Sequence, residues 1–174
     1  EAEQLKNQRI SGLYAAKIIN IVGDPSGPRA VSLIAIHQHG IPNQFPQEVL
    51  QESENINFLE ALPRDDLTKI PFVTIDPSDA RDHDDAVYAH ADEDPSNQGG
   101  HVLWVAIADV AHFVKPGSAL DKEAQKRGNS TYFADRVVPM LPDRLSGDLC
   151  SIHEGVERPC LAVCMTIDKS GNKL

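Results

Sequence analysis

Short apolar runs, more than long helical repeats, dominate the hydrophobic pattern of this chain, and they predict a β-rich α+β fold. Residues 102–108 are apolar at successive positions, which is typical of a central strand covered on both faces. We expect further strands at residues 13–22, 30–36, 72–75, 86–91 and 161–167. Because the Gly- and Pro-rich residues 23–28 join the first two of these, we expect those two strands to form a hairpin from a small β-domain.

Helix signals are fewer and lie between the strands. Pro46, with acidic residues soon after it, predicts a helix beginning in residues 46–52. Ser118 resembles the first residue of a capping box and Gly128 is typical of a helix end, so residues 118–127 should be helical. The weaker expectations are a frayed or helical segment at 1–11, a helical turn at 58–62, an extended segment at 132–142 and a short turn or helix at 145–149.

The charge of the chain is concentrated in one place. The formal net charge of the 174 residues is −10, and residues 76–94, with eight acids and one base, account for −7 of it. A uniformly acidic surface would disfavour nonspecific attraction to nucleic acid or to an anionic membrane. Because the acidity is local, the global value is a poor guide to partners.

Two further features of the sequence bear on membrane association and on the cellular compartment. No apolar run approaches the ~20 residues of a membrane-spanning helix, and three cysteines without a secretory signal argue against a disulfide framework. We therefore expect no membrane partner and a reducing, cytoplasmic location. Only two residues follow the turn predicted at 169–172, and the chain begins without Met, so we expect it to be part of a longer protein.

The densest acidity lies in residues 76–85. Since like charges at this spacing repel, the segment is either a solvated loop or a hard-cation site, and spacing alone leaves both open. A calcium loop starting at Asp82 is disfavoured because Ala86 and Val87 stand where the EF-hand needs an oxygen ligand and Gly. A metal-free carboxylate hydrolase needs only a pair of acids, whereas clustered carboxylates suit Mg²⁺ or Mn²⁺ in phosphoryl transfer.

Several ordered blocks of the sequence form a recognisable series, namely residues 73–76, 79–87, 103–110, 138–142, 145–151 and 158–166. These blocks resemble the ribonuclease II / ribonuclease R (RNB) family. Upstream, residues 30–46 resemble the end of an OB-type cold-shock domain with its linker, which favours the ribonuclease R branch of the family. The resemblance implies three parts: the C-terminal part of that OB-type domain at 1–45, a linker with a short helix at 46–70, and the N-terminal portion of an RNB catalytic domain at 71–174.

The activity implied by the resemblance is a processive 3′→5′ exoribonuclease that hydrolyses single-stranded RNA to nucleoside 5′-monophosphates with Mg²⁺, or alternatively Mn²⁺, and no small-molecule cofactor. The family's four aspartates fall on Asp76, Asp82, Asp84 and Asp85. By this analogy Asp76 and Asp85 are metal ligands, Asp84 is the acid most critical to the chemical step, and Asp82 supports catalysis. A base-stacking family Tyr matches Tyr132, and stacking on an aromatic ring accepts every base.

Other positions carry weaker expectations. Asp109 follows the apolar run 102–108, where it could orient a metal ligand or serve as a buried structural residue. His83 departs from the apolar residue common in the family, and we expect it to face solvent or lie near phosphate. A zinc site at Cys150, His153, Cys160 and Cys164 lacks the paired spacing of zinc knuckles, so we expect the cysteines to be small buried hydrophobes.

Two other functions stay open from the sequence. One is a catalytically inactive RNB-like module that binds RNA or a protein, and the other is a different metal-dependent phosphoesterase such as a DNA nuclease. Because all four aspartates are present, catalysis is favoured in the parent protein. We expect the 174 residues alone to have little activity, since the family's phosphate-contacting arginine is expected beyond residue 174.

Overall fold

The computed structural model describes all residues except 1, 19–20, 22, 25–26, 28 and 57–62. These residues form two compact units, the first made of residues 1–44 and 131–138 and the second of residues 45–130 and 139–174. Helices and antiparallel strands are both present, so the mixed α+β composition is confirmed. None of the described helices is long and apolar enough to cross a membrane.

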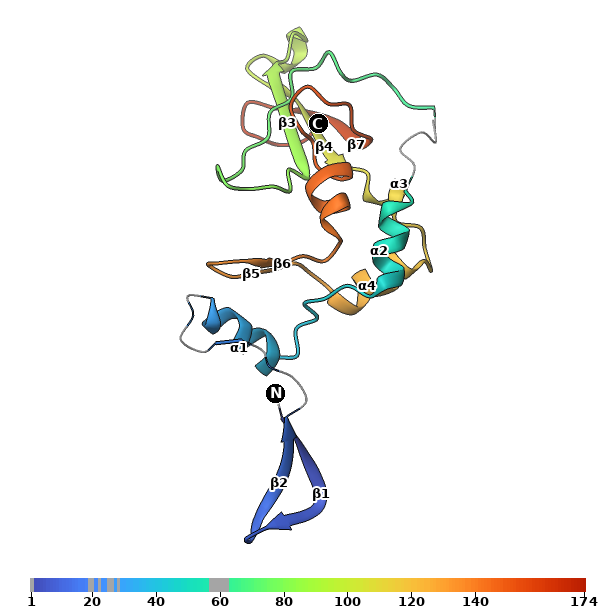
Figure 1. Ribbon diagram of the computed structural model, residues 1–174. Coiled ribbons are helices and arrows are strands. Elements are labelled where there is room, and N and C mark those ends of the chain that lie inside the picture. The colour runs from blue at the N-terminus through green and yellow to red at the C-terminus, as the bar shows by residue number, and fades with distance from the viewer. Residues whose placement is uncertain (1, 19–20, 22, 25–26, 28, 57–62) are drawn as a thin grey trace. The chain divides into compact units, whose positions relative to one another are not determined.

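The first unit contains two strand pairs and one helix (Figure 1). Strands β1 (Ala2–Ile10) and β2 (Leu13–Ile18) pair across a turn at Ser11 and Gly12, both of which have positive φ as tight hairpins require. Helix α1 spans Ala30–Gln38, and the short strands β5 (Thr131–Tyr132) and β6 (Val137–Val138) form a second hairpin.

Two predictions for this unit are wrong. Residues 1–11 are not frayed or helical but contain β1, and residues 30–36 are not a strand but lie in α1. Most residues of 30–38 are apolar, so the spacing of apolar positions could not distinguish a strand from a helix. Ser32 and Ile36 are buried and four residues apart, as on one face of a helix, and Ala30 at the helix start is also buried, whereas Val31 remains 81% exposed. The partner of β2 is therefore β1, and part of the predicted strand 13–22 lies outside the described residues.

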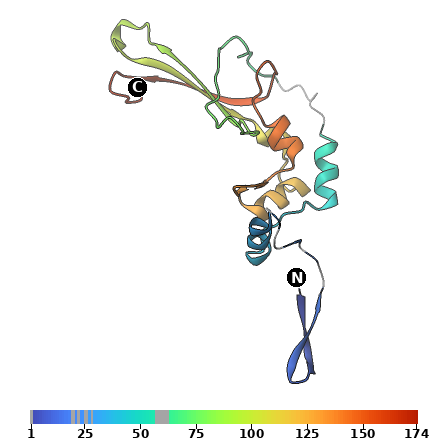
Figure 2. The same cartoon turned by 60° about the vertical axis from the view of Figure 1, so that its left-hand side comes forward.

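The second unit is built on an antiparallel sheet in the order β3-β4-β7, whose strands run side by side in Figures 1 and 2. The strands are β3 (Asp85–Ala91), β4 (His101–Ala108) and β7 (Cys160–Ile167), with the 3₁₀ turn η1 (Pro95–Asn97) between β3 and β4. This confirms the strands predicted at 86–91, 102–108 and 161–167, and the central place of 102–108. The strand predicted at 72–75 is reduced to a single bridge between Val73 and Val87.

One face of this sheet is open among the described residues. Ile107, Leu161 and Val163 share that face by strand register, and they are 46%, 71% and 49% exposed. The opposite face carries the buried Ala86 and Ala106. The expectation that residues 102–108 are covered on both faces is therefore wrong for the described chain.

The helices of the second unit follow the sequence signals closely. Helix α2 (Gln47–Glu54) begins after Pro46, and α4 (Ala119–Arg127) begins where the Ser118 hydroxyl accepts the Asp121 N–H and ends at Gly128 with φ 77°. Residues 145–149 form η2 (Leu145–Leu149), a turn of π-helix, as expected of a short turn or helix. The short helix α3 (Val110–Phe113) was not predicted, and the helical turn expected at 58–62 lies outside the described residues.

These elements pack on a core at one end of the sheet. Its buried members are Val49, Ala108, Phe113, Leu120, Ala124, Leu141, Leu145, Leu149 and Cys150. They come from α2, β4, α3, α4, η2 and the residues that flank η2, so the core ties the end of β4 to the helical layer. Since β3 begins beside that end, the start of β3 lies next to this core.

Candidate active site

The acidic residues lie in a loop that connects the Val73 bridge to the first residue of β3. Asp85 opens β3 and pairs with Ile107, and the Asp84 carbonyl accepts the Ala108 N–H at 2.9 Å. Both aspartates are exposed. Because successive residues of a strand point to opposite faces, Asp84 and Asp85 leave the backbone in different directions. The structure thus fixes the backbone of these two residues against β4 and leaves their side chains accessible.

Asp76 contacts His83 across the loop. The Asp76 Oδ2 lies 2.9 Å from the His83 Nδ1, and both side chains are largely buried, at 17% and 26% exposed. The hydrogen bond from His83 lowers the pKa of Asp76 below its usual value; partial burial opposes it, and a hydrogen bond from Thr74 adds to the lowering. Asp76 is therefore ionised at neutral pH, and the expectation that His83 simply faces solvent is wrong.

The remaining loop aspartates occupy turns. Asp82 is half-buried, and its carbonyl accepts the Asp84 N–H at 3.1 Å. Asp79 is exposed and lies in a turn closed by the Ala80 N–H and the Pro77 carbonyl, a position that suits Asp.

The loop is also bound to residues far along the chain, which sequence reasoning missed. The Ser151 hydroxyl accepts the His83 N–H at 3.0 Å and donates to the Arg81 carbonyl at 3.2 Å. The Ile152 N–H donates to the His83 carbonyl at 2.7 Å. Ser151 belonged to one of the blocks that carried the family resemblance, but no spacing rule connects residue 151 with residue 83.

The carboxylate oxygens of the loop suit a hard cation, although the described side chains form no preformed metal site. Among the residues that the structure describes, no three His, Cys, Asp or Glu side chains come close enough to hold a metal together. Mg²⁺ is bound by one or two carboxylates, with waters and substrate phosphate oxygens completing its shell. The loop carries the carboxylates of Asp76, Asp84 and Asp85 at separate backbone positions, so it can supply the one or two carboxylate ligands that Mg²⁺ needs.

Tyr132 and Asp109 have clear local surroundings. Tyr132 lies in the β5–β6 hairpin of the first unit, opposite Val137, and is 63% exposed, so its ring can be reached by a ligand. Asp109 caps α3 by accepting the His112 N–H and forms an ion pair with Arg64 at 2.7 Å. Partial burial alone would raise the pKa of Asp109, but the hydrogen bonds from Arg64 and His112 outweigh it and lower that pKa. Its role in orienting a metal ligand stays a prediction.

The cysteines differ in exposure. Cys150 is buried in the core, and burial raises the pKa of its thiol to about 12. Cys160 is half-buried, whereas Cys164 is exposed, so the expectation of a buried residue is wrong for Cys164. Within the described part of the chain, these cysteines and His153 form no group of three ligands that could hold a metal ion.

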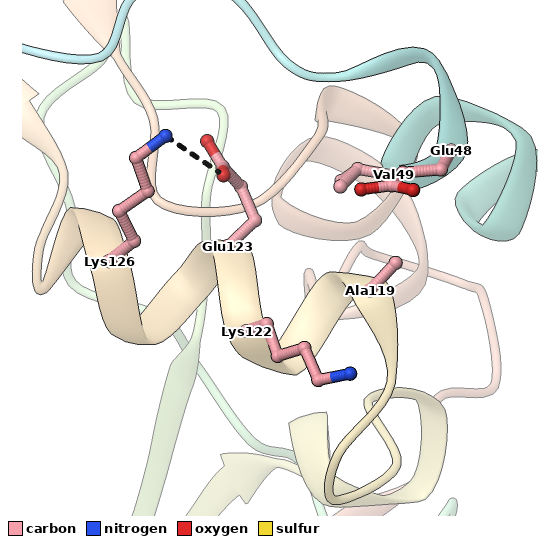
Figure 3. Close-up of a pocket in the computed structure, with 6 residues that line it drawn as sticks. All are labelled: Glu48, Val49, Ala119, Lys122, Glu123 and Lys126. Carbon is pink, nitrogen blue, oxygen red and sulfur yellow. Dashed lines mark ion pairs between the residues drawn. The ribbon is translucent and has the colours of Figure 1, made fainter.

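A pocket in the second unit lies away from the acidic loop. It has a volume of about 230 Å³ between α2 and α4 (Figure 3) and is lined by Glu48, Val49, Ala119, Lys122, Glu123 and Lys126. None of the aspartates assigned from the resemblance lines it. The candidate site is therefore the exposed loop 76–85 and the start of β3, rather than an enclosed cavity.

Comparison with known proteins gives consistent matches. The RNB domain model matches residues 64–174. Ribonuclease R of Vibrio parahaemolyticus is 47% identical over 161 residues, and that of Escherichia coli K12 is 43% identical over 161 residues. Each alignment covers 89% of this chain and 19% of the relative, so the chain spans about a fifth of the length of these curated relatives.

Solved structures show the same likeness. Mycoplasma genitalium RNase R in complex with ribose-methylated single-stranded RNA matches with a TM-score of 0.83 at 31% identity, covering 94% of this chain and 25% of that one. The same protein in complex with double-stranded RNA matches with a TM-score of 0.87 at 29% identity, covering 99% of this chain and 31% of that one.

Proposed function

This chain belongs to the RNB domain family, and on that premise we propose that it is part of a ribonuclease R-like enzyme that degrades single-stranded RNA from the 3′ end. The observation that carries the proposal is the acidic loop at the start of β3, whose four aspartates assigned from the resemblance all lie inside the matched region. The products would be nucleoside 5′-monophosphates, released processively in the cytoplasm.

The chain's own residues have separate parts in this proposal. Asp76 and Asp85 would hold Mg²⁺, or Mn²⁺, and their oxygen-only donor set supports the choice of a hard cation. When bound, the cation would supply charge stabilisation at the scissile phosphate. Asp84 would be the acid most critical to the chemical step and Asp82 would support it. Tyr132, exposed on its hairpin, would stack on a base of the RNA without selecting its identity.

The alternatives are weaker. An inactive RNB-like module that binds RNA or a protein has no need of four clustered aspartates, whose mutual repulsion costs free energy. A DNA nuclease is disfavoured because the two matched solved structures are complexes with RNA.

The experiment uses the full-length protein with end-labelled single-stranded RNA, and with DNA of the same sequence as a control. The expected result is stepwise shortening from the 3′ end, stopped by chelator and restored by Mg²⁺. Asp84→Asn should lower kcat by at least about a hundredfold while RNA affinity stays close to that of the wild type. Asp79→Asn removes the same charge from an exposed turn of the same loop and should leave kcat nearly unchanged.

Two results would contradict the proposal. One is RNA degradation that continues unchanged in excess chelator, and the other is full activity of Asp84→Asn. The 174 residues alone should show little activity in the same assay, because they span only about a fifth of the relatives' length.

A further inference from the structure

A fully buried hydroxyl binds the acidic loop from outside. Ser151 has 0% exposure, and its Oγ contacts both the Arg81 carbonyl and the His83 N–H. With the bond from the Ile152 N–H to the His83 carbonyl, three hydrogen bonds hold the three residues 81–83. A buried hydroxyl costs free energy unless it is hydrogen-bonded, so these partners bind Ser151 and the loop to one another.

The base of this connection is rigid. Ser151 follows η2 (orange in Figure 1), whose Leu145 and Leu149 are buried in the core. The Ser151 N–H donates to the Asp148 carbonyl at 3.0 Å, and the Cys150 N–H donates to the Leu145 carbonyl at 2.7 Å. The backbone that carries the hydroxyl is therefore held by the core, and it cannot follow the loop if the loop moves.

The bonded segment contains one proposed catalytic residue and directly precedes the other. Asp82 lies between the two loop residues that Ser151 contacts, and Asp84 is the next residue after them, with its own carbonyl bonded to Ala108 of β4. The backbone from Arg81 to Asp84 is thus held at one end by Ser151 and at the other by the sheet. This restraint opposes the repulsion among the loop carboxylates, which favours a more open loop.

We propose that Ser151 is a positioning residue, whose hydroxyl keeps the backbone of residues 81–83 in place so that Asp82 and Asp84 are held ready before RNA binds. This inference rests on the proposed function. A displacement of about 1 Å in a catalytic group can lower the rate by about a hundredfold, so loss of the hydroxyl should act on kcat rather than on RNA binding.

Ser53 provides a matched control. It is also a buried serine of the second unit, 1% exposed, and its hydroxyl donates to the Leu50 carbonyl within α2. Ser53→Ala and Ser151→Ala remove the same atom from a buried, hydrogen-bonded site. Only the second removes a contact with the acidic loop.

The experiment compares Ser151→Ala and Ser53→Ala in the full-length protein by amide hydrogen exchange and by steady-state kinetics on single-stranded RNA. Ser151→Ala should speed exchange at the His83 amide and lower kcat by about 10- to 100-fold with little change in KM. Ser53→Ala should leave both unchanged even if it lowers the melting temperature equally. Ser151→Cys, which keeps a side chain of similar shape but bonds only weakly, should resemble Ser151→Ala.

The outcomes separate this inference from the proposed function. If the wild-type protein fails to degrade RNA, the proposed function is wrong. If the wild type is active and the Ser151 variants match Ser53→Ala in both exchange and kcat, the positioning role is overturned. A rise in KM with unchanged kcat would also overturn it, because that pattern shows lost RNA binding instead of displaced catalytic groups.

Discussion

Arg127 is a nearly enclosed cation in the helical layer of the second unit, and its removal should be costly. Its side chain is only 3% exposed, and its Nε donates to Glu123 Oε1 at 2.9 Å, with Glu123 itself 7% exposed. One guanidinium nitrogen donates to the Pro139 carbonyl at 3.0 Å, and the group lies 3.7 Å from the centre of the Phe45 ring. Arg127 thus connects α4 to Phe45, which precedes this helix in the chain, and to Pro139, which follows it.

The variant Arg127→Met removes the charge and keeps most of the apolar stem. Removing one partner of a buried ion pair costs about 3–5 kcal/mol, chiefly because the other charge is left buried. The cation–π contact with Phe45 adds about 0.5–2 kcal/mol, and Met regains part of this by packing on the same ring. Lys126 offers Glu123 a weaker partner at 3.7 Å (Figure 3), which reduces the loss. We expect a net loss of about 3 kcal/mol in the free energy of unfolding.

The assay is equilibrium urea unfolding followed by the fluorescence of Trp104, the only tryptophan, which lies in β4 of the same unit. A loss of this size should lower the urea midpoint by about 1–2 M. The control is Lys126→Met, which removes the exposed partner of the same carboxylate and should cost less than about 0.5 kcal/mol. Adding Glu123→Leu to Arg127→Met should restore at least about 1 kcal/mol, because no buried charge is then left unpaired.

A loss of less than about 1 kcal/mol for Arg127→Met, or no more than for Lys126→Met, would refute the unpaired-charge penalty. A double variant less stable than Arg127→Met alone would also refute it, because the penalty would then come from lost packing and not from an unpaired carboxylate.

Two further predictions concern titrating groups. Iodoacetamide at pH 8 should label Cys164 in the folded protein well before Cys150, because Cys164 is exposed while burial raises the pKa of Cys150 to about 12. Mass spectrometry measures the two labelling rates, and equal rates would contradict the core position of Cys150. Since the folded-state pKa of Asp109 lies below its unfolded value, the Arg64–Asp109 contact should stabilise the fold above about pH 4, and this contribution should be lost as the pH falls through the folded-state pKa. At pH 7 the wild type should therefore be more stable than Arg64→Met by on the order of 1 kcal/mol in unfolding free energy, measured by urea unfolding. This difference should shrink as the pH falls through the folded-state pKa of Asp109, and a difference that grows with falling pH would refute the assignment.

Local signals in the sequence predicted most of the second unit. The strands at 86–91, 102–108 and 161–167 have strongly apolar runs, and the cap at Ser118 and the glycine at 128 define a helix through neighbouring backbone groups alone. The acidic loop was found in the same way, because its residues are adjacent in the chain. The family assignment likewise rests on ordered local blocks, and the match over residues 64–174 confirms it.

The first unit shows where local signals fail. The segment 30–38 is apolar at positions compatible with either a strand or a helix, and only its packing decides between them. In the fold, the Ser32 hydroxyl donates to Asp135, 103 residues away, and that side of the segment is the buried one. No pattern within nine residues could have contained that information.

The sequence by itself therefore determined which acidic residues are the candidates for the chemistry, and the tertiary structure decided how their loop is held. The contacts of Ser151 with residues 81 and 83 span 70 and 68 positions of the chain, and the ring of His83 is turned onto Asp76 within a folded loop. The enclosure of Arg127 similarly depends on Phe45 and Pro139 arriving from separate segments. Propensity and periodicity act over a few neighbouring residues, whereas these contacts exist only once distant segments have packed against one core.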